Sequence, residues 1–193
     1  METTKIPVEI YTEATPNPNT LKFVTDKMLV PEGSVDFTTP SSAEACPMVL
    51  DLFRFDFVKR VFMTANFVTV TKSEGLEWTE VNMMIKSVIK GYVEEGKPLF
   101  KEIPKNISTS APVEGEPEVV TKIKVVLEEY IRPAVEQDGG AINFESFIDG
   151  VVKVQLQGSC SGCPSSTVTL KSGIENLLKR MVPEVTEVVA EGV

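Results

Sequence analysis

The chain has 193 residues, of which 42% are hydrophobic, and a formal net charge of −9. That hydrophobic fraction is high enough for folded cores and excludes a disordered chain, while the acidic excess disfavours nucleic acid and anionic membranes as partners. The sequence contains no histidine, which excludes imidazole metal ligands and histidine-dependent nucleophiles.

The first predicted elements are strands. Residues 8–13 and 21–24 are expected to be joined by residues 15–20, where two prolines fix backbone angles and remove ladder donors. Residues 58–63 and 67–71 predict a hairpin that turns at residues 64–66, because β-branched and aromatic side chains fill both arms.

Two helices are expected in the same half of the chain. Ser41 or Ser42 can cap a short helix that reaches Leu52, and Thr79 can cap a longer helix with apolar residues at helical spacing up to Tyr92. Residues 1–97 therefore predict a small α+β domain. Residues 98–117 are rich in Pro, Ser and Glu and have no apolar period, which predicts a linker.

After the linker, residues 118–193 predict a second α+β domain of α-β-β-α-β order with a three-stranded sheet. Its expected elements are a helix over residues 118–137, strands over 141–148 and 151–156, a helix over 164–181 and a strand over 185–190. Asp149-Gly150 is a strong two-residue hairpin signal. Asp138-Gly139-Gly140 predicts the end of the first helix, and it can also shape a pocket.

The chemistry of the chain is expected at Cys160-Ser161-Gly162-Cys163, directly before Pro164. Because proline favours the first position of a helix, both sulfurs are expected near the unpaired N–H groups and the positive dipole of a helix N-terminus. Thiolates are favoured there, which suits metal binding and redox exchange alike.

The number of ligands favours metal binding by two chains. A tetrahedral metal site or a cluster takes four protein ligands, whereas the sequence has three cysteines in all and Cys46 is distant from the other two. We interpret Cys46 as a buried apolar residue. A homodimer in which each copy contributes Cys160 and Cys163 would supply four thiolates around its symmetry axis.

Two other uses of the same cysteines stay open at this point. A strand, a C-x-x-C pair and a helix also begin a thioredoxin-like dithiol redox site. Thiolates bind zinc as well as iron, so a bridging zinc could hold two chains together without further function.

The C-terminal half resembles the C-terminal domain of NifU, found in Nfu-type iron–sulfur carriers. The residues that carry this resemblance are Asp138-Gly139-Gly140, 154–158, 159–167, 170–175 and 182–185. The first half is similar to the N-terminal domain of many Nfu proteins, through residues 13–23 and 67–72. Together the two matches cover nearly the whole chain apart from the linker.

The resemblance implies a carrier that is not an enzyme. Its expected cargo is a labile [4Fe-4S] cluster held between two subunits by Cys160 and Cys163, received from upstream assembly proteins and passed to apo-proteins. Hydroxyl groups of Ser165, Ser166 and Thr167 either donate hydrogen bonds to cluster sulfides or cap the first turn of the helix. Residues 1–13 show neither a signal nor a transit pattern, so we expect a cytoplasmic protein.

Overall fold

The computed structural model describes residues 6–101, 115–161 and 164–192, and the side chains of residues 164–167 lie outside this description. The described residues form two compact units, one before and one after residues 102–114. Each unit combines helices with its own sheet, so the expected α+β class is confirmed. The domain limits at residues 97 and 117 stay predictions.

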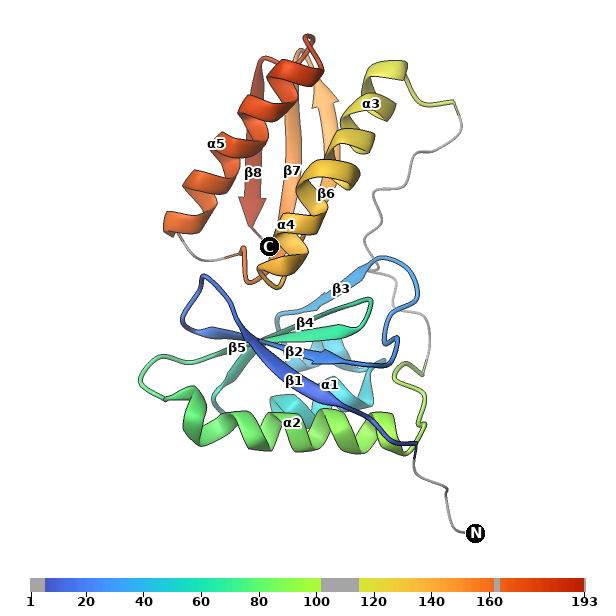
Figure 1. Cartoon of the computed structure of the whole chain (residues 1–193), viewed down its shortest axis with the longest axis vertical. Helices are drawn as coiled ribbons and strands as arrows, with labels where there is room; N and C mark the ends of the chain where they lie inside the picture. Colours follow the sequence, from blue (N-terminus) through green and yellow to red (C-terminus); the bar gives the residue numbers. More distant parts are fainter. Residues whose placement is uncertain (1–5, 102–114, 162–163, 193) are drawn as a thin grey trace. The chain divides into compact units, whose positions relative to one another are not determined.

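The N-terminal unit is a five-stranded antiparallel sheet with strand order β1-β2-β5-β4-β3. Figure 1 shows its two α-helices on one face of this sheet. The elements in chain order are β1 (Ile10–Ala14), β2 (Thr20–Thr25), β3 (Ser34–Phe37), the 3₁₀-helix η1 (Pro40–Ala43), α1 (Pro47–Phe53), β4 (Val58–Thr64), β5 (Phe67–Lys72) and α2 (Trp78–Glu94).

The two predicted strand pairs are confirmed, and the reason lies in the period of their side chains. Val61 and Met63 of β4 and Val68 and Val70 of β5 alternate into one buried core, as residues two apart on a strand must. Helix α2 contributes Ile85 and other apolar residues at three- and four-residue spacing to the same core.

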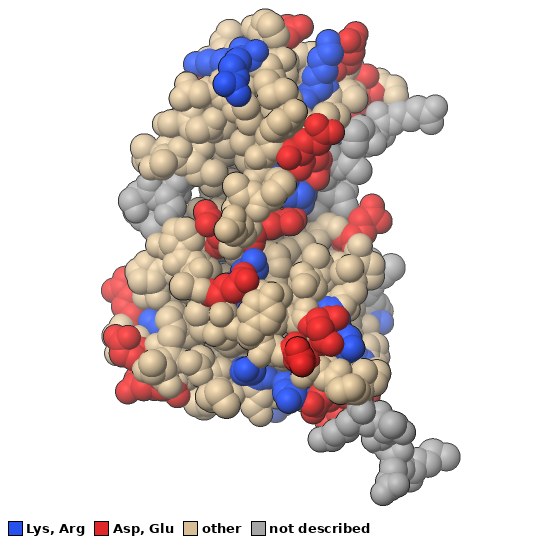
Figure 2. All heavy atoms as spheres, in the orientation of Figure 1, with Lys and Arg blue, Asp and Glu red and all other residues tan. Residues whose placement is uncertain are grey.

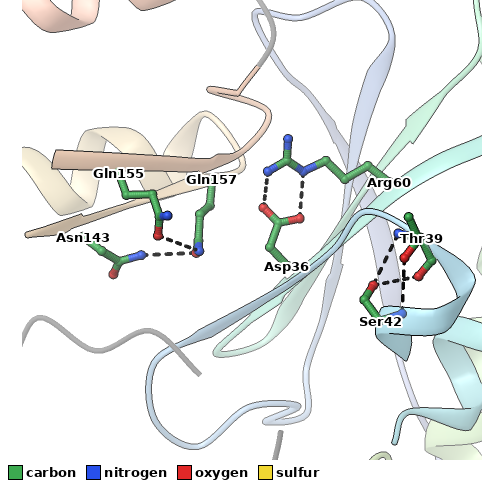
Figure 3. Close-up of polar contacts among 7 residues, drawn as sticks. All are labelled: Asp36, Thr39, Ser42, Arg60, Asn143, Gln155 and Gln157. Atoms are coloured by element: carbon green, nitrogen blue, oxygen red, sulfur yellow. Dashed lines mark hydrogen bonds and ion pairs between the residues drawn. The ribbon is translucent and has the colours of Figure 1, made fainter. Parts of the chain in front are cut away.

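Strand β3 was not expected from the sequence, because it has four residues and carries an acid in its middle. Asp36 forms an ion pair with Arg60 of β4, in which Arg60 Nε lies 2.7 Å from Asp36 Oδ1 (Figure 3). Planar, two-point pairing of this kind gives an arginine–carboxylate pair a defined geometry. The cross-strand partner thus explains a strand that local pattern alone does not reveal.

Both predicted helix caps were wrong by a few residues. Thr39, rather than Ser41 or Ser42, accepts the Ser42 amide at 3.3 Å (Figure 3), and a separate helix α1 begins at Pro47. Proline favours a helix start and cannot donate inside a helix, so one continuous helix through Pro47 is disfavoured. Helix α2 begins at Trp78, one residue before Thr79.

The C-terminal unit has a three-stranded sheet of order β6-β7-β8 with helices on one face (Figure 1). This confirms the predicted α-β-β-α-β order. Its elements are α3 (Glu118–Val126), the π-helical turn η2 (Leu127–Ile131), α4 (Arg132–Gln137), β6 (Gly140–Ile148), β7 (Val151–Gly158), α5 (Pro164–Met181) and β8 (Glu187–Gly192).

The expected single helix over residues 118–137 contains the π-helical turn, and Pro133 explains its position. Proline has no N–H for the carbonyl four residues earlier and its ring crowds that carbonyl. The preceding turn widens, and the Arg132 amide bonds to the Leu127 carbonyl, five residues back. The helix continues as α4 to Gln137, so its end lies where the sequence predicted.

The hairpin and the last strand complete the unit. Asp149 and Gly150 have φ values of 50° and 82°, as a two-residue hairpin turn requires. Strand β8 pairs parallel to β7 and begins at Glu187 rather than residue 185, because the Val185 amide closes a turn onto Val182. The Glu175 carboxylate of α5 accepts the Val188 amide of β8 at 3.1 Å and so ties this helix to the edge strand.

Candidate functional site

Cys160 lies in a tight turn directly after β7. Gly158, the last residue of that strand, has a φ of 67°, and the Ser161 amide bonds to the Gly158 carbonyl at 3.2 Å. Glycine takes such positive φ values without strain. The Cys160 side chain is 5% exposed and belongs to the buried core of the C-terminal unit. The turn therefore directs this sulfur inward.

A second turn, Asp138-Gly139-Gly140, holds the Cys160 turn in place. Gly139 has a φ of 81° and its amide bonds to Glu136, so the predicted helix end is confirmed. The Ser159 amide donates to the Gly139 carbonyl at 3.3 Å, and the Ser159 hydroxyl donates to the Asp138 carbonyl. The same residues thus end a helix and fix the backbone next to the candidate ligand.

Side chains before the turn are also linked. The amide of Asn143 on β6 donates to Gln157 Oε1 at 3.2 Å, and Gln157 Nε2 lies 3.5 Å from Gln155 Oε1 (Figure 3). These contacts join β6 and β7 immediately before Ser159. On the other side, a β-carbon on Gly192 of β8 would lie 3.1 Å from Ser161 Oγ. Strand β8 therefore ends beside the turn of residues 159–161, which directly follows β7.

Cys163 lies outside the described residues, as do the side chains of Ser165, Ser166 and Thr167. Pro164 is the first residue of α5, so the predicted helix start after the cysteine pair is confirmed. The pairing of Cys160 with Cys163 as ligands stays a prediction. Within the described ranges, no group of three or more histidine, cysteine or acidic side chains comes together as a metal site.

Cys46 belongs to the other unit, where it lies in the buried core. It is fully buried before α1, and burial raises the pKa of its thiol to about 11, although the Val49 and Met48 backbone groups partly oppose that shift. The interpretation of Cys46 as a buried apolar residue is confirmed.

We therefore expect Cys46 to resist alkylation in the folded chain. At pH 8 a thiol with this pKa is about 0.1% thiolate, and the thiolate is the reactive form. Iodoacetamide labelling at pH 8, followed by peptide mass spectrometry, should leave Cys46 unmodified until urea unfolds the protein. Rapid labelling of Cys46 in the native chain would contradict its burial.

The surface is acidic, in keeping with the net charge of −9. Figure 2 shows aspartate and glutamate side chains on both units, with lysine and arginine between them. None of the described helices combines the length and the apolar character that crossing a bilayer requires.

Comparison with known proteins gives two family matches. Residues 123–189 match the NifU-like domain, and residues 10–96 match the N-terminal domain of scaffold protein Nfu/NifU. The first match contains both the Cys160 turn and the turn that holds it.

Individual relatives agree over most of the chain. The human protein named NFU1 iron-sulfur cluster scaffold homolog, mitochondrial, is 44% identical over 91% of this chain and 69% of its own length. NifU-like protein 5, mitochondrial, of Arabidopsis thaliana is 43% identical over 94% of this chain and 67% of its own length. A Drosophila ananassae relative with the same name as the human protein is 41% identical, and the chain spans 63% of it.

These names contradict the expected cytoplasmic location, because the relatives are named mitochondrial. The expectation relied on the absence of a transit pattern in residues 1–13. Such an absence says nothing about the compartment in which the folded domains work, because import depends on a leader and not on the fold.

Proposed function

Since the chain belongs to the Nfu family of iron–sulfur cluster scaffold proteins, we propose that it holds an iron–sulfur cluster and delivers it to apo-proteins. The observation that carries the proposal is the C-x-x-C pair between β7 and α5, within the range that matches the NifU-like domain. The protein is a carrier and not an enzyme.

Cys160 and Cys163 are the proposed ligands. With no histidine and with Cys46 buried in the N-terminal core, one chain offers two thiolates for a cluster that takes four. Two chains related by a two-fold axis would supply Cys160 and Cys163 twice. We propose a [4Fe-4S] cluster bridged in this way, so that the loaded form is a homodimer.

Delivery is proposed to be ligand exchange. A cysteine thiolate of the recipient forms a bond to an iron atom while the bond from Cys160 or Cys163 to that iron breaks. The displaced sulfur takes up the proton that the incoming thiol lost, and no electron is transferred. A cluster shared by two chains is easily released, since loosening the dimer removes half of its ligands.

The proposed partners are upstream cluster-assembly proteins and apo-proteins that bind a cluster through cysteines. The names of the relatives support a mitochondrial setting for these exchanges.

Anaerobic reconstitution with iron and sulfide tests the function. The purified chain should gain broad visible absorption, bind about four irons per two chains, and shift from monomer to dimer in analytical ultracentrifugation. Incubation with an apo-ferredoxin should move the absorption to that recipient, which is then separated by anion exchange.

Two other results would contradict the proposal and indicate a different function. A bridging zinc would copurify at about one ion per two chains and give a colourless dimer. A dithiol redox protein would form a reversible disulfide between Cys160 and Cys163 and reduce a disulfide substrate without iron.

A further inference from the structure

Gly140, the first residue of β6, has no space for a side chain because Cys160 occupies it. A β-carbon built on Gly140 would lie 2.8 Å from Cys160 Sγ and 3.3 Å from Cys160 Cβ. It would also lie 2.6 Å from the carbonyl oxygen of Gln157. Real β-carbons do not approach other atoms this closely, so any other residue would displace the sulfur or the strand.

Ser159 also contacts the Cys160 sulfur. Its side chain is buried, its hydroxyl donates to the Asp138 carbonyl, and its Oγ lies 3.9 Å from Cys160 Sγ. A hydroxyl oxygen that donates to a carbonyl still has lone pairs, so it can accept a weak hydrogen bond from the thiol. The sulfur therefore fits closely against Gly140 and makes a polar contact with Ser159.

This inward position differs from the one that ligation needs. The Cys160 side chain is 5% exposed, whereas a ligand shared with a second chain must reach the surface. The turn of residues 159–161 is joined to the 138–140 turn through two hydrogen bonds of Ser159, one from its amide and one from its hydroxyl.

We propose that Gly140 and Ser159 form a niche that stores the Cys160 sulfur in the cluster-free chain, and that Cys160 leaves this niche when it becomes a ligand. Gly140 and Ser159 are thus positioning residues for Cys160. The niche protects the thiol from oxidants and stray metals between rounds of delivery, a role that rests on the proposed function.

Alkylation of Cys160 in cluster-free protein tests the niche. The wild-type chain, kept anaerobic with a chelator at pH 8, is treated with iodoacetamide, and the Cys160 peptide is quantified by mass spectrometry. Amide hydrogen exchange of β7 is measured on the same samples and reports opening of the whole unit. We expect native Cys160 to react at least about tenfold more slowly than in urea, because exposure limits thiol reactivity.

Gly140→Ala and Ser159→Ala should each raise the alkylation rate of Cys160 about tenfold, because a displaced or loosened thiol becomes exposed. Amide hydrogen exchange of β7 should stay at the wild-type level, at least in Ser159→Ala. The matched control is Gly173→Ala on α5, where an added β-carbon meets nothing within 4 Å. This variant should keep the wild-type rate.

Three results would overturn the niche. Native Cys160 could react at the unfolded rate while β7 stays protected, or both variants could stay within about twofold of wild type. Alternatively, β7 exchange could rise with Cys160 reactivity in both variants, which would mean that these residues only hold the unit together. The alkylation experiment uses cluster-free protein throughout. A chain that protects Cys160 but never binds iron would therefore contradict the proposed function, and the niche would still hold.

Discussion

Replacing either Cys160 or Cys163 with alanine should abolish cluster loading. Each substitution removes two of the four proposed ligands from a bridged dimer, and an alanine offers no atom that can bind iron. After anaerobic reconstitution, both variants should lack the broad visible absorption, retain no iron on desalting, and remain monomeric in the ultracentrifuge. Wild-type protein treated in parallel should show all three changes.

Cys46→Ala is the matched control, since it removes the third cysteine of the chain from the other unit. It should load as much iron as wild type, although loss of a buried side chain costs some stability. An equal loss of iron in Cys46→Ala would show that the third thiol is a ligand. Normal loading of Cys160→Ala or Cys163→Ala would disprove the bridged site.

Ile174→Ala should strongly destabilise the C-terminal unit. Ile174 is fully buried on α5 and packs in the core formed by the helices and the sheet. Removing its side chain leaves a cavity, and such substitutions cost about 2–5 kcal/mol in the free energy of unfolding. For a domain of this size the loss is a large part of the total stability. Urea unfolding, followed by hydrogen exchange of β7 peptides, measures the change in the free energy of unfolding of this unit.

Ile148→Ala provides the matched control, because the same side chain is 65% exposed at the end of β6. Its free energy of unfolding should stay within about 0.5 kcal/mol of wild type. Similar losses in the two variants would contradict the packing of α5 on the sheet. Cluster loading of Ile174→Ala should fall together with its folded fraction.

Most elements of the fold were predictable because they depend on local pattern. The β4–β5 hairpin, the Asp149-Gly150 turn and helix α5 follow from side-chain period and turn residues over short stretches. The missed features have two different reasons. Strand β3 is explained by a distant partner, since Asp36 pairs with Arg60, 24 residues away. The cap at Thr39 is a local hydroxyl contact that several neighbouring residues could have made.

The candidate site divides in the same way. Cys160 and Cys163 were singled out by residue type, spacing and the helix start at Pro164, and none of these needs a tertiary structure. The contact of Gly140 with Cys160 was not predicted. In the sequence Gly140 signals a turn, and a turn signal does not say what lies against the glycine.

Sequence alone thus limited the expected chemistry to sulfur ligands, because the chain has no histidine and one close pair of thiols. Tertiary structure decided where the described sulfur rests. The turns of residues 138–140 and 159–161 meet because β6 and β7 pair antiparallel, with Gly140 opposite Gly158. That register depends on the packing of the whole sheet, and it brings Cys160 Sγ into a space that a glycine leaves open.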